Sequence, residues 1–458
     1  MTEIKDIFSS VQEFCDGNHL IDVADKVPIF VCSIGAHIFN AINKCSMCDF
    51  DPAKAEDPED FTIDYCPLRH DNNPIYTPMS QLADTRVHIL IRGDKGSGKS
   101  ALIKMFLAEG TGLLWHRDSF TAGVGFRTMT GPNSVTESGL FGSVQEDGTI
   151  AGRPLARELC GGFLGFEEFS SLTDAMRKDH SVDMKNQLLT STDNGRVMKA
   201  LKQGWVRYNT RYTIWAGTQP GRFEMASGLD RRFFILDIDM SPSKESEFKK
   251  AMARQSAMTG ETRASLAEQC IQIKEWIKSR MTNAILDPPT GVCFSDDLTD
   301  WIQQPAVRSF ESDLFRRLAI GYTMMKPEYK GGQILMVELD EPLLGLLNDS
   351  LKMRRNVMDA DLALIKASLW GKDVAKSTLI KEVSRMVTSG DYQQAKRWIE
   401  DNLHHQTWYE ETIPPSSGRG RKGVICRIGF KRQQEGVISS DATKQVASPE
   451  KLQWGQKQ

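Results

Sequence analysis

The stretch that decides the fold is Gly93-Asp94-Lys95-Gly96-Ser97-Gly98-Lys99-Ser100, which matches the pattern G-x-x-x-x-G-K-[ST]. It follows an apolar run that reads as a strand, Val87–Ile91, and it precedes a helical pattern, Ala101–Leu107. Glycines in such a loop let successive backbone N–H groups face phosphate oxygens, and the following helix adds partial positive charge. Lys99 would then reach the β- and γ-phosphates, and Ser100 would ligate Mg²⁺. The eight residues therefore predict a site for ATP with Mg²⁺ as cofactor.

The pattern around this loop predicts an α/β fold. From residue 87 to about residue 240, short β-branched runs alternate with helical segments, which is typical of a parallel sheet. The strand candidates are Val87–Ile91, Phe163–Phe166, Tyr212–Ala216 and Phe233–Ile238. Helical patterns before and after this region include Ile34–Ile42 and Ser309–Met325. The predicted division is a short N-terminal segment (1–28), an αβ core (29–243) with a polar insertion (45–84), a helical lid (244–355), a winged helix (356–432) and a disordered tail (433–458).

Composition limits the class of protein. The 458 residues are 40% hydrophobic and 26% charged, and the net charge of −3 means that any nucleic-acid affinity must come from a local basic patch. The longest apolar runs are of strand length, and the acidic N-terminus does not resemble a secretion signal. Nine irregularly spaced cysteines argue against a disulfide framework. These features predict a soluble, cytoplasmic protein that does not insert into a membrane.

Two adjacent carboxylates end the second predicted strand. An ATPase with a phosphate loop needs one carboxylate in the Mg²⁺ shell and another to polarise the attacking water, and Glu167 and Glu168 suit these roles in that order. The next predicted strand ends in a polar tip, where Gln219 or Thr218 is the candidate to hold the lytic water. Without the loop, the acid pair would read equally well as a solvated strand end.

A pair of arginines precedes the last predicted strand. A guanidinium from Arg231 or Arg232 could reach the γ-phosphate of a neighbouring subunit, as arginine fingers do. A surface cluster of arginines explains the pair equally well, so the sequence leaves both readings open.

Several motifs in this order resemble the MCM (minichromosome maintenance) branch of the AAA+ ATPases, over about residues 29–325 and with an extension to 432. Gly93-Asp94 with Lys99-Ser100 is similar to G-D-x-G-x-x-K-S, and Gly162–Phe169 (GFLGFEEF) is similar to G-x-x-x-I-D-E-F. The remaining matches are Asn209–Arg211 with Gln219-Pro220 (N-A-R…A-A-N-P), Arg232-Phe233 (S-R-F) and Arg308–Ser312 (R-x-L-E-S, the sensor-2 helix).

This resemblance implies a three-layer αβα ATPase domain with a helical lid, assembled as a ring, in which Arg232 and Arg308 act on a neighbour's ATP. It also implies two DNA-contacting pore hairpins. They would lie at Gly142–Arg153 and Met198–Tyr208, and Lys199, Lys202 and Arg207 would grip phosphates in the second one. An ordinary solvated hairpin is the alternative for that segment.

The chain departs from the family pattern at three places. Glu167 stands where the family has Asp, and Gln219 stands where the sensor is Asn. About 28 residues precede the ATPase region, where the family has a large DNA-encircling region. The resemblance therefore points to a minimal form of the helicase.

Two further constellations concern a metal and DNA. Cys45, Cys48, Cys66 and His70 have a spacing that could hold zinc, although free thiols in a loop are the more ordinary reading. Residues 366–432 carry 13 Lys and Arg against 7 Asp and Glu. The helical patterns are Ala360–Leu369, Lys376–Val387 and Tyr392–Leu403, and they are followed by Arg419, Arg421 and Lys422 and by a β run, Gly423–Phe430. This order predicts a winged helix that binds DNA or docks on protein.

Taken together, the sequence predicts a hexameric, ATP-driven DNA helicase or translocase that acts in DNA replication. Two other functions stay open. One is an AAA+ ATPase that remodels a transcription complex, because Glu137–Gly142 faintly resembles the E-S-E-L-F-G of bacterial activators. The other is an ATP-switched, origin-binding protein that works through the winged helix.

Overall fold

The computed structural model describes residues 4, 6–42, 84–115, 128–131, 135–145, 154–159, 162–169, 172, 182–202, 204–210, 212–219, 231–238, 242–287, 289, 291–369, 372–387, 392–403, 408–413 and 423–428.

The centre of the molecule is a five-stranded sheet in the order β2-β3-β6-β1-β7, and all of its strands run parallel. The strands are β1 (His88–Arg92), β2 (Thr128–Thr130), β3 (Phe163–Phe166), β6 (Thr213–Thr218) and β7 (Phe233–Asp237). Every residue of β1, β3 and β6 is buried, as expected for a parallel sheet covered on both faces. The predicted α/β fold with a parallel sheet is confirmed, and each of the four predicted strands agrees to within two residues.

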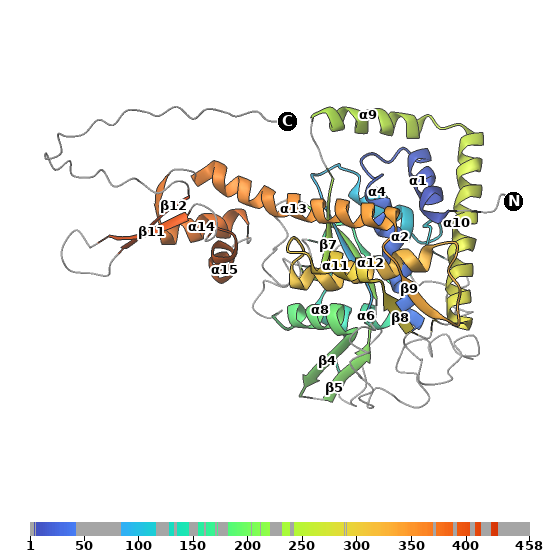
Figure 1. The fold of residues 1–458 in the computed structure, drawn as a ribbon, viewed down its shortest axis with the longest axis horizontal. Helices are drawn as coiled ribbons and strands as arrows, with labels where there is room; N and C mark the ends of the chain where they lie inside the picture. The colour runs from blue at the N-terminus through green and yellow to red at the C-terminus, as the bar shows by residue number, and fades with distance from the viewer. Residues whose placement is uncertain are drawn as a thin grey trace, which may run out of the picture.

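Helices cover both faces of the sheet (Figure 1). Because side chains alternate along a strand, Ile89 and Ile91 belong to one hydrophobic core and Leu90 to the other. The first core includes α2 (Val27–Ile42), α4 (Lys99–Leu107), α10 (Gly260–Leu286), α11 (Asp296–Gln303) and α12 (Ser309–Met325). The second includes α5 (Glu137–Phe141), α6 (Leu155–Glu158) and α8 (Val182–Asn194). This arrangement is compatible with a three-layer αβα domain.

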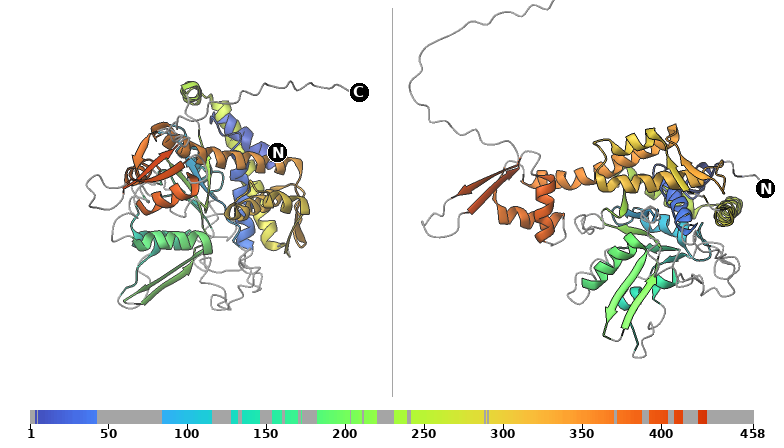
Figure 2. Two further views of the ribbon diagram at one scale, coloured as in Figure 1. Left: turned by 60° about the vertical axis from the view of Figure 1, so that its left-hand side comes forward. Right: turned by 60° about the horizontal axis from the view of Figure 1, so that its bottom comes forward.

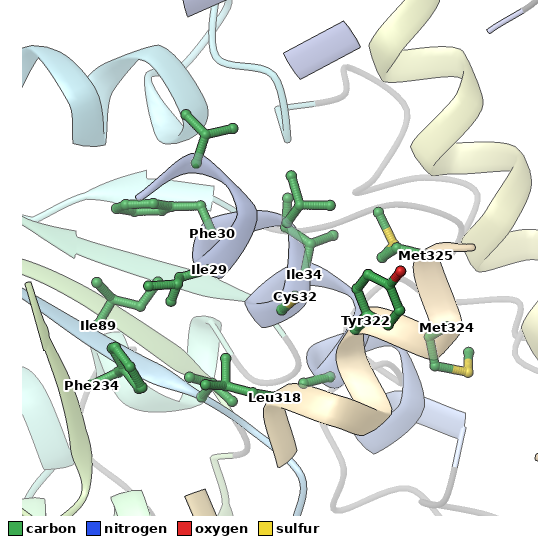
Figure 3. Packing of buried hydrophobic residues seen from close by; sticks show 14 of the residues in the cluster. Ile29, Phe30, Cys32, Ile34, Ile89, Phe234, Leu318, Tyr322, Met324 and Met325 are labelled. Carbon is green, nitrogen blue, oxygen red and sulfur yellow. The ribbon is translucent and has the colours of Figure 1, made fainter. Parts of the chain in front are cut away.

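Glycines allow α2 and α12 to cross at close range. A Cβ on Gly321 would lie 1.9 Å from the carbonyl oxygen of Cys32, and one on Gly35 would lie 2.1 Å from the carbonyl oxygen of Gly321. Figure 3 shows the buried side chains where these helices pack near Ile89 of β1 and Phe234 of β7. The helices after the sheet therefore share one core with it.

The N-terminal residues are part of this core. α1 (Ile7–Gly17) was not predicted, and its first turn is capped by Asp6, whose carboxylate accepts hydrogen bonds from the Phe8 and Ser9 N–H groups at 3.1 and 3.0 Å. α1 packs against α2 and α10. α2 begins at Val27, earlier than the helical pattern that the sequence shows from Ile34.

A long helix connects the core to a small C-terminal unit. α13 (Glu341–Leu369) is roughly 43 Å long at 1.5 Å per residue. Leu343 and Leu347 at its start belong to the core of the sheet, and Ile365 and Leu369 at its end belong to a separate cluster. Figures 1 and 2 show the C-terminal unit at the far end of this helix. The predicted helix start at Ala360 was wrong, and the predicted boundary at 355/356 falls inside α13.

The C-terminal unit combines two helices with an antiparallel sheet in the order β10-β12-β11. Its elements are β10 (Asp373–Ala375), α14 (Lys376–Met386), α15 (Tyr392–Asn402), β11 (Trp408–Ile413) and β12 (Gly423–Ile428). The two helices and β12 agree closely with the predicted elements, whereas β11 was not predicted. Two further strands, β8 (Gly291–Phe294) and β9 (Ile334–Val337), form a parallel pair beside the main core.

A buried ion pair ties three elements together near the start of β7. Arg354 of α13 donates from Nε to Glu311 Oε1 of α12 at 3.0 Å and from Nη1 to the Phe233 carbonyl oxygen at 3.0 Å. The side chains of Arg354 and Glu311 are 5% and 0% exposed. The N-terminus of α12 therefore lies at the amino end of β7.

Candidate functional site

The loop Gly93–Ser100 connects β1 to α4 in the way the sequence predicts. Gly96 and Gly98 have φ values of +88° and +83°, which L-residues rarely adopt, and Gly98 is the N-cap of α4. The Gly93 N–H donates to the Thr218 carbonyl oxygen at 3.1 Å, and this bond fixes the loop to the end of β6. The N-terminal turn of α4 thus opens at the carboxyl edge of the sheet, where its N–H groups can bind an anion.

Lys99 folds back onto the loop. Its Nζ donates to the carbonyl oxygens of Gly93 and Asp94 at 2.7 and 2.8 Å, and the residue is 7% exposed. Burial lowers the pKa of Lys99, and the carboxylates of Glu168 and Asp94 oppose this shift. A cation held among carbonyl oxygens is well suited to exchange them for phosphate oxygens, which carry a full negative charge.

Glu168 and Gln219 meet at the same edge. β6 lies between β1 and β3, and its tip therefore stands between the loop and the acidic strand end. Gln219 donates from Nε2 to Glu168 Oε2 at 3.2 Å, whereas the Thr218 side chain is fully buried. Of the two candidates at this strand tip, Gln219 is the one that faces the carboxylate.

Glu167 faces α4 instead. Its Oε1 accepts a bond from Lys104 Nζ at 2.8 Å, and the two side chains are 32% and 49% exposed. Lys104 lies four residues after Ser100, so both residues share one face of α4. Mg²⁺ is usually bound by one or two protein oxygens together with phosphates and waters. Ser100 and Glu167 fit that donor set, and neither side chain is fully buried.

The arginine pair lies at the opposite edge of the sheet. β7 pairs with β1 in parallel, with Phe233 opposite His88 and Asp237 opposite Arg92, so Arg232 lies at the amino end. The five residues of β7 span about 16 Å, which separates the pair from the loop of its own chain. Arg232 forms an ion pair with Asp193 of α8, and the Arg232 side chain is 7% exposed. The Arg231 side chain is 56% exposed, and its Nη2 lies 3.7 Å from Oδ2 of the same Asp193.

Arg308 lies near the same edge. It is the exposed N-cap of α12, and its backbone N–H donates to Glu311 Oε2 at 3.0 Å. The other oxygen of Glu311 binds Arg354, which reaches the start of β7. Three arginines of the sequence prediction, at 231, 232 and 308, are therefore gathered away from the loop of their own chain.

The predicted hairpin at Met198–Tyr208 is present. β4 (Arg196–Leu201) pairs antiparallel with β5 (Gly204–Asn209), and Lys202 is exposed at the turn. Lys199 forms an ion pair with Glu137 of α5, and the two side chains are only 14% and 16% exposed. The contact between Lys199 and Glu137 turns that lysine towards the protein, so Lys202 is the better placed of the two to meet a ligand.

The turn of the β4–β5 hairpin lies close to the start of the first predicted hairpin region, Gly142–Arg153. Gly204, which pairs with Leu201 at the turn, is a neighbour of Val144: a Cβ on Gly204 would lie 3.6 Å from Val144 Cγ1. Residues 146–153 and the side chain of Arg207 lie outside the described part of the chain, as do Arg419, Arg421, Lys422 and the zinc candidates Cys45, Cys48, Cys66 and His70. Within the described part, no group of three or more His, Cys, Asp or Glu residues could hold a metal ion.

Sequence reasoning did not identify Lys104, Glu137 or Asp193. Each is the ionic partner of a predicted site residue. No local pattern marks them, because each pair joins residues at least 39 positions apart in the chain.

Comparisons with known proteins give no further identification. No family model matches the chain, and no curated protein matches it. Among the described residues, no helix is both long enough and apolar enough to cross a membrane.

Proposed function

We propose that this chain is a Mg²⁺-dependent ATPase of the MCM-like AAA+ type that works as a ring-shaped oligomer, a hexamer, and translocates on or unwinds DNA during replication. The observation that carries the proposal is the convergence of Lys99, Glu168 and Gln219 at the carboxyl edge of the sheet, around a loop with the phosphate-binding sequence.

These residues suit the hydrolysis of ATP. Lys99 would bind the β- and γ-phosphates, and Glu168 would accept a proton from the attacking water. Gln219, which already bonds to Glu168, would orient that water. Ser100 and Glu167 would hold Mg²⁺, which when bound neutralises the charge that develops on the phosphates.

The position of the arginines supports a ring. Arg231, Arg232 and Arg308 lie about a strand length from the loop of their own chain, so a role in hydrolysis requires a neighbouring copy. A head-to-tail contact between copies would bring the amino edge of one sheet to the loop of the next, and such contacts close into rings.

The hairpin and the C-terminal unit support the DNA part of the proposal. The β4–β5 turn carries the exposed Lys202 and projects from the sheet at the end opposite to the loop (Figure 1). We also propose that residues 372–428 form a winged helix, since two helices lie in sequence between β10 and the β11–β12 pair of one antiparallel sheet, and the β11–β12 connection contains the Arg-rich segment.

The test is ATP hydrolysis with and without DNA, measured together with strand displacement on a forked duplex. Glu168→Gln should bind ATP but lose hydrolysis and displacement. The matched control, Glu261→Gln, changes an exposed glutamate at the start of α10 and should behave as the wild type.

Each other outcome selects a different function. Hydrolysis without displacement would favour an ATPase that remodels a protein complex. ATP-dependent DNA binding without hydrolysis would favour an origin-binding switch. Displacement that survives Glu168→Gln would overturn the motor, and a particle without ring symmetry in electron micrographs with ATP would overturn the assembly.

A further inference from the structure

An aromatic side chain contacts the phosphate loop from the helix that follows the sheet. α9 (Pro242–Ser256) carries Phe248, whose Cε1 lies 3.2 Å from the position that a Cβ on Gly98 would occupy. Gly96 faces open space and Gly93 faces Ser97 and Ile238, so of the three glycines only Gly98 meets an aromatic ring. The Phe248 ring therefore borders the start of α4, next to the position where phosphates bind.

α9 is otherwise a largely solvent-exposed helix. Phe248 and Ala251 are its main inward-facing residues, and Phe248 itself remains partly exposed. The ring packs against the hydrophobic core, it borders Gly98, and it remains partly exposed. A partly exposed aromatic ring next to an anion site is a suitable platform for a flat, apolar group that is attached to the anion.

The segment between α1 and α2 adjoins the same helix. Lys244 of α9 lies 3.7 Å from a carboxylate oxygen of Asp22, and Gln255 donates to the Asn18 carbonyl oxygen at 2.6 Å. Lys244 precedes Phe248 by four residues, so the two share one face of α9 and are about 6 Å apart along its axis. Both the 18–22 segment and the phosphate loop therefore contact α9.

The backbone of this segment is unusual. His19 and Asp22 have φ values of +56° and +59°, and they are the only non-glycine residues with positive φ in the described part of the chain. Among non-glycine residues, Asp and His adopt this left-handed conformation most readily, so both fit a tight turn here. The turn between α1 and α2 brings the Asp22 carboxylate to Lys244 of α9.

We propose that Phe248 forms the base-binding wall of the nucleotide site, with the 18–22 segment as its neighbour, so that the site selects nucleoside triphosphates over bare phosphate chains. The inference rests on the proposed phosphate-binding role of Gly93–Ser100. The base stacks on the open part of the Phe248 ring while its phosphates lie at the N-terminus of α4. Because purines have the larger π-face, ATP and GTP bind more tightly than CTP and UTP.

The test compares two ligands, ATP and inorganic tripolyphosphate, by calorimetry in the presence of Mg²⁺. Tripolyphosphate has the phosphates but no base. Base–aromatic stacking contributes enough that Phe248→Ala should weaken ATP binding by roughly 5- to 100-fold and leave tripolyphosphate binding unchanged. Phe248→Tyr should restore ATP affinity. Phe248→Leu, which fills space without a π-face, should not.

Two controls separate this inference from its alternatives. Met252→Ala removes a 66% exposed side chain one turn further along α9 and should change neither affinity. Thermal unfolding of each variant checks that α9 remains docked. Lys99→Ala should weaken both ligands, because it removes the phosphate contact.

The results that would overturn the proposal are specific. If Phe248→Leu restores ATP binding, or if Phe248→Ala weakens both ligands equally, the ring acts only as a spacer that supports the loop. If Phe248→Ala leaves ATP binding unchanged, the base lies elsewhere. A wild-type chain that binds neither ligand, or a Lys99→Ala variant that binds both normally, would instead refute the phosphate site itself.

Discussion

Replacing Arg231 with alanine tests whether the proposed ATP site is completed by a neighbouring copy of the chain. Arg231 is 56% exposed and lies at the amino end of β7, whereas the phosphate loop lies at the carboxyl edge of the same sheet. The two ends of β7 are about 16 Å apart. Arg232, beside it, is held by Asp193 and is 7% exposed. Arg231 is therefore the arginine of the pair that is available to a partner.

The expected loss is large and confined to hydrolysis. An arginine supplied to a γ-phosphate contributes about 10³- to 10⁵-fold to kcat in enzymes of this mechanism. Arg231→Ala should lose hydrolysis on that scale while keeping ATP affinity and thermal stability. Arg232→Ala should lower thermal stability as well, because it leaves Asp193 without its closest ionic partner.

A mixing assay distinguishes action within a chain from action between chains. Lys99→Ala chains have a defective loop and an intact Arg231, and Arg231→Ala chains have the reverse. Each assembly alone should be inactive. In an equal, random mixture, about one interface in four pairs an intact loop with an intact Arg231, so about a quarter of the wild-type rate should return.

The reasoning would be refuted by a mixture that co-assembles, as shown by co-purification of differently tagged chains, yet recovers no activity. Arg231 would then act within its own chain or not at all. Normal hydrolysis by Arg231→Ala combined with loss in Arg232→Ala would move the role to the buried arginine.

Three other perturbations have defined outcomes. Gly321→Ala places a methyl group against the backbone of α2 and should lower the free energy of unfolding by about 3 kcal/mol or more. Gly345→Ala is the control: it adds a methyl group at an open position of α13 and should raise the free energy of unfolding by up to about 1 kcal/mol. Denaturant titration measures both. Burial lowers the pKa of His88 to about 3, whereas the pKa of a histidine in the unfolded chain is 6.5. Between these two pH values the unfolded chain therefore binds more protons at His88 than the folded chain does. The stability that depends on neutral His88 should be fully present above pH 6.5 and be lost towards pH 3, by at most about 5 kcal/mol. A His88→Gln variant should lose stability less steeply over that window, in which carboxyl groups still titrate, and an unchanged profile would contradict this cause. Lys202→Ala should weaken single-stranded DNA binding and lower the slope of log K against log salt concentration by about one. Lys199→Met should leave that slope unchanged, because Lys199 is paired with Glu137. A larger effect of Lys199→Met than of Lys202→Ala would refute the roles assigned to the two lysines.

Elements with a strong local pattern could be predicted from the sequence. β3 and α12 have the predicted limits, Phe163–Phe166 and Ser309–Met325, because an unbroken apolar run and a regular helical period are local properties. The phosphate loop is equally local, since its glycines, Lys99 and the flanking elements are contiguous. α1 was missed although its pattern is also local: Asp6 is an N-cap, and the buried residues Ile7, Val11, Phe14 and Cys15 have helical spacing. The strand β11 depends on a tertiary contact instead, because it is held by its pairing with β12.

Local patterns were enough to predict the parallel sheet, the glycine-rich loop with the phosphate-binding motif and the two carboxylates at a strand end. Which of these side chains meet could not be predicted in the same way, because contacts across the sheet depend on strand order. The placement of β6 between β1 and β3 brings Gln219 to Glu168, and the parallel register of β7 with β1 carries Arg231 away from the loop of its own chain. α9 likewise brings Phe248 to Gly98 across 150 residues of chain, and no local pattern encodes such a contact.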